Sequence, residues 1–552
     1  MSTETELKFR IPAARLAAVR RAVATRTAVI EPLTAVYFDT PGEHLAQARV
    51  ALRLRREAGG WVQTLKAEGA LALQRLEHNV ALAQADLRGP GVADSRPALD
   101  LKRHAGSEAG AVLARVLAHA PPGQRLVARY ATEVRRTHRL LRFEGARIEL
   151  ALDEGRITAG EAVCAVLEIE FELLSGPPQA LLRLAARWAA RFGLELDVRS
   201  KSERGHRLAL GQPSSLATRA RPLKLSRRAA PGAALAAMLG NALSQVLANA
   251  SPLAELAELA ELAAPSSAAR VGEAPPGAAP EPQSRPDSEL LHQLRVGLRR
   301  LRTVLQVFAP LLPASVTDLA PALAQLFAQL GAARDRDAMA QTLWPALRAA
   351  GAPWTEGPAT PALTAPDPLP ALLASPAVQQ LWLALLAATL ADKPAQAPAA
   401  GAVGPASPEA AEPAIPAAPA KLREAFSAAL DHLLRQVQRD AARFEHLDEA
   451  LRHRLRRRIK RLRYATELTV ALWPAKPVAR LLKRLAQAQT PLGDYNDCVV
   501  AQAHYRQLAT QEPEAWFAVG WLSARRQSLE PGCIAALVRL AGCKAGKACW
   551  HG

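Results

Sequence analysis

The sequence predicts an α+β protein of two parts, a strand-rich N-terminal part and an all-helical C-terminal part. Up to about residue 210, several segments alternate apolar and charged residues with period two, as strands with one charged face do. From about residue 232, Ala and Leu recur at spacings of three and four, which is typical of helices. A chain of 552 residues is also too long to fold around one hydrophobic core of ordinary size, so we expect separate domains.

The strand patterns carry their charge in blocks. The charged members are Glu4, Glu6 and Lys8; Arg53 and Arg55; and Glu168, Glu170 and Glu172. Helical patterns interrupt the strands at 12–24 and 177–192. Like charges on one strand face repel unless counterions lie among them. The blocks therefore suit a closed barrel that holds a divalent cation beside phosphates, and the patterns alone leave an open sheet with a solvated charged face as an equal alternative.

Composition changes mark the expected domains. We expect an N-terminal domain over 1–210, a basic linker over 211–231 and a helical domain over 232–552. Two segments rich in Pro, Ala and Gly, 264–287 and 351–420, are expected to be flexible loops.

The helical part contains a repeat. Each copy has a histidine followed by basic residues at offsets of three, seven, eight and ten. The two sets are His292, Arg295, Arg299, Arg300 and Arg302, and His453, Arg456, Lys460, Arg461 and Arg463. A Leu-Gly pair follows each set at nearly the same distance, Leu330-Gly331 and Leu492-Gly493. We interpret these as two structural repeats.

The charge balance indicates which class of binding partner to expect. Lys and Arg total 70 against 51 Asp and Glu, a net charge of +19, which favours a polyanion. We find no stretch that reaches the roughly 20 apolar residues needed to span a bilayer. The first ten residues lack the apolar core of a signal peptide, and the five cysteines are scattered. We therefore expect a cytoplasmic protein that binds no membrane.

The motifs of the N-terminal part follow one another in a specific order. They are ETELK (Glu4–Lys8), VYFDT (Val36–Thr40), ALRLRRE (Ala51–Glu57), WVQTLK (Trp61–Lys66), RLEHNV (Arg75–Val80), RIELALDEG (Arg147–Gly155), LEIEFELLSG (Leu167–Gly176) and SKSERG (Ser200–Gly205). This series resembles the CYTH, or triphosphate tunnel metalloenzyme, superfamily over about residues 1–210. The resemblance implies an eight-stranded antiparallel tunnel that binds a triphosphate with Mg²⁺ or Mn²⁺.

The resemblance also implies roles for single residues. Metal ligands would be Glu4, Glu6, Glu168 and Glu170, and the substrate-binding residues Lys8, Arg53, Arg55, Lys66, Arg75, Arg136 and Lys201. Lys8, Glu170 and Lys201 would act in catalysis, Lys201 by positioning the substrate or the attacking water. Of the adjacent Arg135 and Arg136, we favour Arg136 as the inward one. Glu149 and Asp153 are either metal-side acids or solvated residues at strand ends.

The two basic helices of the repeat present stripes, because offsets of zero, three, seven and ten share one helix face. Eight of the twelve residues 452–463 are Lys or Arg. Side by side, two such helices would form a cationic groove, whereas apart they would be ordinary solvated faces. Non-specific nucleic-acid binding is a competing interpretation, although few aromatic residues for base stacking lie near.

Residues from about 225 to 552 resemble the CHAD domain on both basic helices and both Leu-Gly turns. The resemblance implies a domain of two repeated helical bundles that binds inorganic polyphosphate through the two sets of residues above. This chain departs from the pattern in the long 351–420 segment and in Asn496, which stands where the first copy has Arg334.

Together, the two resemblances predict a triphosphatase that hydrolyses inorganic triphosphate to pyrophosphate and phosphate, tethered to a polyphosphate-binding module. Thiamine triphosphatase and class IV-type adenylate cyclase are the alternative enzymes. A non-catalytic polyphosphate-binding scaffold is the alternative of another class.

Overall fold

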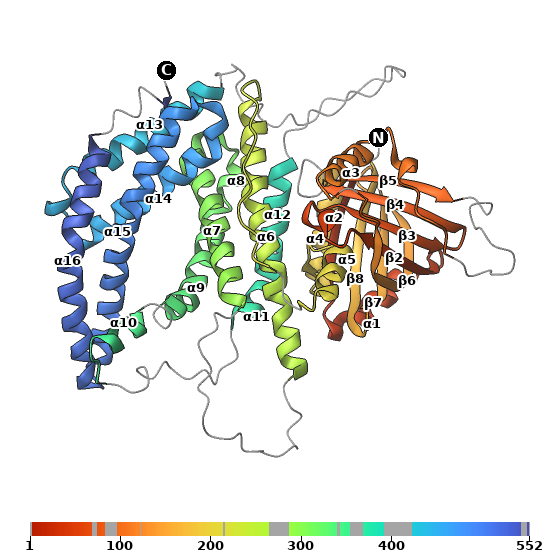
Figure 1. Cartoon of the computed structure of the whole chain (residues 1–552), viewed down its shortest axis with the longest axis horizontal. Helices are drawn as coiled ribbons and strands as arrows, with labels where there is room; N and C mark the ends of the chain where they lie inside the picture. The colour runs from red at the N-terminus through yellow and green to blue at the C-terminus, as the bar shows by residue number, and fades with distance from the viewer. Residues whose placement is uncertain are drawn as a thin grey trace, which may run out of the picture.

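The computed structural model describes residues 3–68, 74–82, 96–121, 123–212, 216–263, 286–338, 343–353, 368–390, 422–542 and 549–550. A strand-rich half and a helical half lie side by side (Figure 1). The predicted division into two folds is therefore confirmed.

The N-terminal half is a closed antiparallel barrel. Its eight strands are β1 (Thr3–Arg10), β2 (Val29–Asp39), β3 (Ala51–Glu57), β4 (Gly60–Glu68), β5 (Gln74–Leu82), β6 (Val127–Phe143), β7 (Ala146–Ala159) and β8 (Ala162–Ser175). Their order is β5-β4-β3-β2-β6-β7-β8-β1, and β1 also pairs with β5, which closes the ring. The short β9 (Glu195–Leu196) pairs with the end of β1, beyond its pairing with β5. The predicted eight-stranded antiparallel barrel is confirmed.

Alternation along β1 explains why the barrel closes around charge. Leu7 and Phe9 are fully buried in the core that helix α4 (Pro178–Phe192) shares with the sheet. The Phe9 and Phe171 rings meet edge to face, with centroids 5.7 Å apart. Glu4, Glu6 and Lys8 have the opposite parity, so their side chains point into the lumen.

Helices cover the outside and one end of the barrel. Those of this half are α1 (Leu16–Val23), α2 (His44–Gln47), α3 (Glu108–Ala118), α4 and α5 (Lys201–Ala209). Helix α5 packs across β6, β7 and β8, which brings its first residue, Lys201, to the lumen.

The C-terminal half is all-helical where the structure describes it. Its helices are α6 (Pro231–Ala263), α7 (Pro286–Val307), α8 (Ala314–Thr317), α9 (Ala320–Ala338), α10 (Trp344–Ala349), α11 (Pro368–Ala374), α12 (Pro376–Leu390), α13 (Leu422–Ala441), α14 (Glu449–Thr469), α15 (Ala475–Leu508) and α16 (Trp516–Ala541). The two basic helices of the repeat are α7 and α14, and they pack against each other. The predicted linker precedes α6 in the chain and lies against it in space: the Asn249 side chain accepts a hydrogen bond from the Thr218 N–H and donates one to the Thr218 carbonyl.

The prediction of a flexible loop over 351–420 was wrong for residues 368–390. They form α11 and α12, and Trp382 and Leu386 of α12 are fully buried. The Pro-rich composition concealed an apolar helix that packs between α6 and α4. Residues 354–367 and 391–420 of that segment lie outside the described residues, as do residues 264–285 of the other predicted loop, since α7 begins at Pro286.

The expectation that no stretch could span a bilayer was also wrong. Residues Pro231–Glu255 of α6 are long and apolar enough by length and composition. Of the qualifying window, 61% is buried inside the protein, because α6 packs against α7, α11 and α12. Its apolar character is accounted for by this place in the helical core.

Candidate active site and cationic groove

A cavity inside the barrel collects four of the predicted phosphate-binding cations. Arg53 and Arg55 reach it from β3, Arg136 from β6 and Lys201 from the start of α5. Asp153, Thr132 and the apolar side chains of Leu33, Ala35 and Val134 complete the lining. Arg136 points inward and its neighbour Arg135 is exposed, as predicted. Cations from two strands and a helix thus converge on one small volume.

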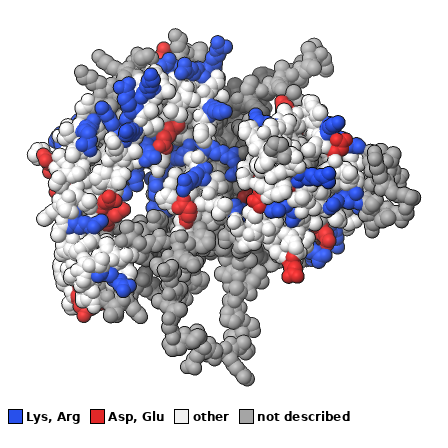
Figure 2. Space-filling model, in the orientation of Figure 1, with Lys and Arg blue, Asp and Glu red and all other residues white. Residues whose placement is uncertain are grey.

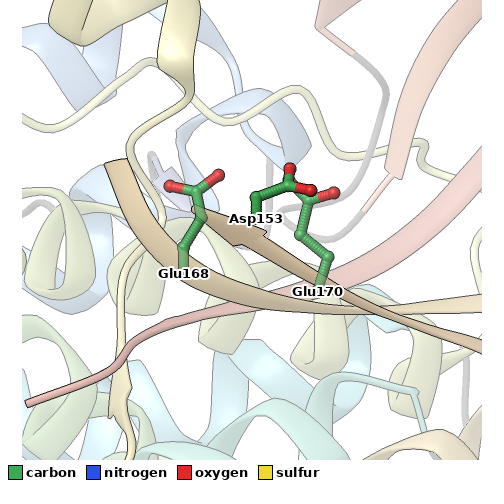
Figure 3. A group of neighbouring side chains, drawn as sticks. All are labelled: Asp153, Glu168 and Glu170. Carbon is green, nitrogen blue, oxygen red and sulfur yellow. The ribbon is translucent and has the colours of Figure 1, made fainter. Parts of the chain in front are cut away.

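Three carboxylates form a cluster at this cavity. Asp153 lies on β7, Glu168 and Glu170 on β8, and one oxygen of each lies within 4.8 Å of the others. The register of β7 and β8 places Asp153 directly opposite Glu168, and Figure 3 shows all three side chains rising from the two strands toward one place. The Asp153 side chain is only 1% exposed. It is therefore a member of the buried cluster and not a solvated residue at a strand end.

Two cations, Lys201 and Arg136, are paired with the carboxylates of this cluster. The Lys201 ammonium lies 2.6 Å from Asp153 and 2.9 Å from Glu170, and it also bonds Glu168. Arg136 donates to Asp153 and Glu170. Burial acts to raise the pKa of Glu170, but Lys201 and Arg136 outweigh it and hold that pKa well below its usual range. The same carboxylates raise the pKa of Lys201 well above its ordinary value, against the effect of its own burial.

Lys8 reaches the same cluster from β1. Its ammonium donates to the backbone carbonyl of Arg199 and lies 4.0 Å from Glu168. The register of β1 and β8 sets Lys8 opposite Glu170. The three residues predicted to act in catalysis, Lys8, Glu170 and Lys201, are thus brought together.

The carboxylate cluster fits a divalent cation chemically. Three convergent carboxylates are the hard oxygen donors that Mg²⁺ and Mn²⁺ prefer, and two buried cations already neutralise them here. Burying three carboxylates together is costly unless cations lie beside them. Asp153, Glu168 and Glu170 are the residues that would hold the ion.

Glu4 and Glu6 lie in a second charged cluster further along β1, apart from the other two predicted metal ligands. The Lys66 ammonium is 2.7 Å from Glu4 and 3.1 Å from Glu77, and Arg75 is 3.8 Å from Glu6. The register sets Glu6 opposite Glu172 and Lys8 opposite Glu170, so Glu4 and Glu6 lie outside the three-carboxylate cluster, and the four-glutamate metal site stays a prediction. Lys66 and Arg75, predicted to bind phosphate, belong to this second cluster.

Carboxylates outnumber cations in the second cluster, and the pKa values of three of these carboxylates are shifted. Burial raises the pKa of Glu4 to about 9; Lys66 opposes this rise, and Glu6 and Glu77 add to it. Burial also raises the pKa of Glu172 to about 7, together with the neighbouring Glu149. Burial acts to raise the pKa of Glu77, but Lys66 and a hydrogen bond from Glu4 lower it to about 2. Glu4 and Glu77 are therefore joined by a hydrogen bond between their carboxyl groups.

Tyr37, which belongs to the VYFDT motif, is a lumen residue for which no role was predicted. Its hydroxyl accepts a hydrogen bond from Arg53 at 3.1 Å, and its ring stacks on Tyr130 with centroids 4.7 Å apart. Burial acts to raise the Tyr37 pKa, but Arg53 outweighs it and the pKa falls below its ordinary value. Tyr37 thereby fixes the direction of the Arg53 side chain. Its parity with Ala35 on β2, which lines the cavity, was the available signal.

The two basic stripes of the helical half meet. Arg295, Arg299 and Arg302 of α7 surround the Phe327 ring, 4.7 to 5.7 Å from its centroid. Burial together with Arg456, Arg299 and Arg295 lowers the pKa of Lys460 on α14 to about 7. Burial and the nearby Arg302 likewise lower the pKa of Arg461. The two stripes therefore form one cationic surface between α7 and α14, called the groove below, and Figure 2 shows Lys and Arg side chains along the middle of the molecule.

The repeat is structural as well as sequential. A Cβ added to Gly331 would lie 3.6 Å from Arg295, and one added to Gly493 would lie 3.9 Å from Arg456. The arginine at offset three therefore lies against the repeat glycine in both copies. In the second copy, Arg456 also pairs with Asp497 at 3.5 Å. The side chains of Arg334 and Asp335, the counterparts in the first copy, lie outside the described residues.

Three of the predicted polyphosphate-binding residues have other partners. Arg300 is buried against α6, where it donates to Asn241 at 2.7 Å and Gln245 at 3.2 Å, so including it in the groove was wrong. Offset eight turns it to the far side of α7. Arg463 donates to Glu467 at 2.7 Å and Gln489 at 2.6 Å. The His453 ring is hydrogen-bonded to Asn496, and His292 is half-buried on α7.

Comparison with known proteins finds a matching domain family for each half of the chain. Residues 2–205 match the CYTH domain model, and residues 278–506 match the CHAD domain model. The chain is 29% identical over 179 residues to an inorganic triphosphatase of Haemophilus influenzae, a match that covers 32% of this chain. It spans about half of that relative, 46% of its length.

Two solved structures resemble the halves separately. The CHAD domain of the plant Ricinus communis is 26% identical with a TM-score of 0.39, covering 59% of this chain and 96% of that one. A Hippeastrum protein described as an adenylyl cyclase with a dominant triphosphatase activity is 20% identical with a TM-score of 0.26, covering 37% and 94%. The strand register, the ordered lumen motifs and the two domain matches lead to one conclusion: this chain is a CYTH-CHAD protein, with a CYTH domain followed by a CHAD domain.

Proposed function

We propose that the barrel hydrolyses inorganic triphosphate with the help of a divalent cation, and that the groove between α7 and α14 binds inorganic polyphosphate. The observation that carries the first proposal is the barrel cavity, where Arg53, Arg55, Arg136 and Lys201 converge beside the Asp153–Glu168–Glu170 cluster. Cations that hold a polyphosphate next to carboxylates that hold a metal are what phosphoryl transfer requires. The triphosphatase from Haemophilus influenzae supports this choice of substrate.

In the proposed reaction a water oxygen bonds to the terminal phosphorus. The bond from that phosphorus to the bridging oxygen breaks, and pyrophosphate, phosphate and one proton are released. Arg53 and Arg55 bind the non-reacting phosphates, and Arg136 and Lys201 neutralise the charge that develops on the transferred group. Lys8 holds the substrate from the β1 side. A cation bound by Asp153, Glu168 and Glu170 would supply Lewis acidity and a more acidic water.

Inorganic triphosphate is preferred over thiamine triphosphate and ATP on the lining of the cavity. Apart from the cations and Asp153, its walls are Leu33, Ala35, Thr132 and Val134. These small side chains offer no aromatic surface on which a purine or a thiamine ring would stack, and the Tyr37 ring of the lumen is already stacked on Tyr130. The cyclase and thiamine triphosphatase alternatives therefore lack a base-binding wall among the described lining residues.

The groove proposal rests on charge of one sign. Burial and Arg457 lower the pKa of Arg302, and burial with Arg456 and Arg299 lowers that of Lys460. Asp497, near Lys460, is the one carboxylate among the neighbours that affect these two described groups. A linear polyanion would neutralise such a groove. A single aromatic ring, Phe327, lies under the arginines, and they cover it, so it offers little for base stacking. This favours polyphosphate over nucleic acid.

The test is phosphate release by the full-length protein. Inorganic triphosphate, ATP and thiamine triphosphate are offered in parallel with Mg²⁺, with Mn²⁺ and with a chelator. We expect metal-dependent release that is fastest from inorganic triphosphate. No release from any of them, with polyphosphate still bound tightly in equilibrium dialysis, would favour the scaffold alternative.

A further inference from the structure

The segment that carries Lys201 into the barrel is also the segment that contacts the helical half. It runs from Glu195 to Lys201. Its first residues pair with β1 through Phe9 and Arg10, and the Asp197 N–H donates to the Lys8 carbonyl at 3.0 Å. On its other side it faces α6 and α12. The segment is thus held between the barrel and the helices.

Hydrogen bonds from the helical half reach the backbone of this segment directly. The Leu196 N–H donates to the Gln379 side chain of α12 at 2.7 Å. The Ser251 hydroxyl of α6 donates to the Leu196 carbonyl at 3.3 Å and accepts from the Val198 N–H at 3.4 Å. Gln379 and Ser251 are both buried. Backbone groups that a lone barrel would leave to water are satisfied here by the other domain.

An ion-pair chain joins the same helix to the tunnel lysines. Glu255 of α6 pairs with Arg199 at 2.5 Å. Arg199 is 5% exposed and also bonds Asp197 through two guanidinium nitrogens. The carbonyl of this same Arg199 accepts the hydrogen bond from Lys8, and Lys201 follows two residues later. Moving Arg199 would therefore move the acceptor of one active-site lysine and the backbone support of the other.

We propose that the helical domain positions the active site of the barrel, with Glu255 as the positioning residue that acts through Arg199 on Lys8 and Lys201. This rests on the proposed triphosphatase function for its kinetic consequence. Glu255 touches neither the cavity nor the carboxylate cluster. It fixes the Glu195–Lys201 segment, and a displacement of catalytic groups by about 1 Å can cost on the order of 100-fold in rate.

The test variant is Glu255→Gln in the full-length protein, which removes the charge and keeps the shape. The matched control is Glu144→Gln, which breaks the ion pair of Glu144 with Arg183 on the barrel surface. We expect kcat for inorganic triphosphate to fall about tenfold or more in the first variant, with KM changed less than about twofold, because the arginines of the cavity remain. The control keeps the wild-type kcat.

A second measurement separates this inference from the proposed function. Hydrogen–deuterium exchange should become faster in peptides covering 195–204 of Glu255→Gln while strands β6 to β8 keep their protection. If the wild type releases no phosphate, the proposed function fails and the exchange alone decides the positioning role. Wild-type kcat and wild-type exchange in Glu255→Gln would overturn it. Should that variant unfold, Gln379→Ala is measured in the same way and must show the same local exchange.

Discussion

Lys201 of the barrel and Lys460 of the groove are the same residue type with opposite pKa shifts. Three carboxylates surround Lys201 and raise its pKa well above the ordinary value. Lys460 is largely buried beside three arginines, and both its burial and their charge lower its pKa to about 7. The barrel thus contains both signs of charge in contact, whereas the groove concentrates one sign. The function of a buried lysine is set by its neighbours, because burial penalises any charge that they do not compensate.

The difference distinguishes two ways of binding a polyanion. In the lumen, Lys66, Arg136 and Lys201 are already paired with carboxylates, so the site is stable without a ligand and can organise a metal with the substrate. In the groove, the cations repel one another, so a bound anion relieves an unfavourable arrangement. We expect the first to serve chemistry and the second to serve retention.

The largest expected effect comes from breaking the lumen cluster. Glu170→Gln removes one of three carboxylates that would hold the cation and leaves Lys201 and Arg136 with fewer counterions. We expect metal-dependent phosphate release from triphosphate to fall at least about 100-fold, with polyphosphate affinity unchanged. Glu161→Gln, at an exposed position of the β7–β8 turn, is the control and should behave as wild type. Undiminished turnover in Glu170→Gln would remove the cluster from the mechanism.

The second effect reverses the charge of the groove. Replacing Arg299, Arg456 and Lys460 with Glu should weaken polyphosphate binding by about 100-fold or more at low salt and flatten its salt dependence, because fewer counterions are released. Triphosphate turnover should stay as it is. The control reverses three exposed basic residues of α15, Lys476, Arg480 and Lys483. If the control loses as much affinity as the groove variant, binding follows net charge and not the groove.

The smallest expected effect concerns pH. An anion bound in the groove favours protonated Lys460, so binding takes up a proton near pH 7. Polyphosphate affinity should therefore fall by up to about tenfold as pH rises from 6 to 8, and Lys460→Met should show a flatter profile. Lys483→Met, at an exposed site, should keep the wild-type slope. Identical slopes in the wild type and Lys460→Met would assign the titration elsewhere.

The same lysine affects the free protein with a definite sign. The pKa of Lys460 is lower in the folded protein than the ordinary value of 10.5. Between about pH 7 and 10.5 the unfolded chain therefore binds the extra proton. The contribution of Lys460 to the free energy of unfolding rises with pH across that window, and the penalty is fully present below it.

Local patterns predicted the elements but not their partners. Alternation along β1 and β8 placed Glu4, Glu6, Lys8, Glu168 and Glu170 on charged strand faces, and the closure of the barrel makes these faces the lumen. The alternation did not reveal that Glu6 stands opposite Glu172, which separates Glu6 from the carboxylate cluster. Likewise, the equal offsets of Arg300 and Arg461 hid their different surroundings, because Arg300 alone faces polar side chains of α6.

The sequence by itself determined the two folds and the repeated basic helices, since these follow from periodicity within short segments, and the resemblance of its ordered motifs to the CYTH superfamily implied the closed barrel with a charged lumen. Only the tertiary structure decided which charges meet. Strand register brought Asp153 into the carboxylate cluster, and packing buried α12 between the halves. The contact of Glu255 with Arg199 joins residues 56 positions apart. Such pairings depend on the geometry of the whole chain, because residues far apart in sequence become neighbours only when the core that carries them has formed.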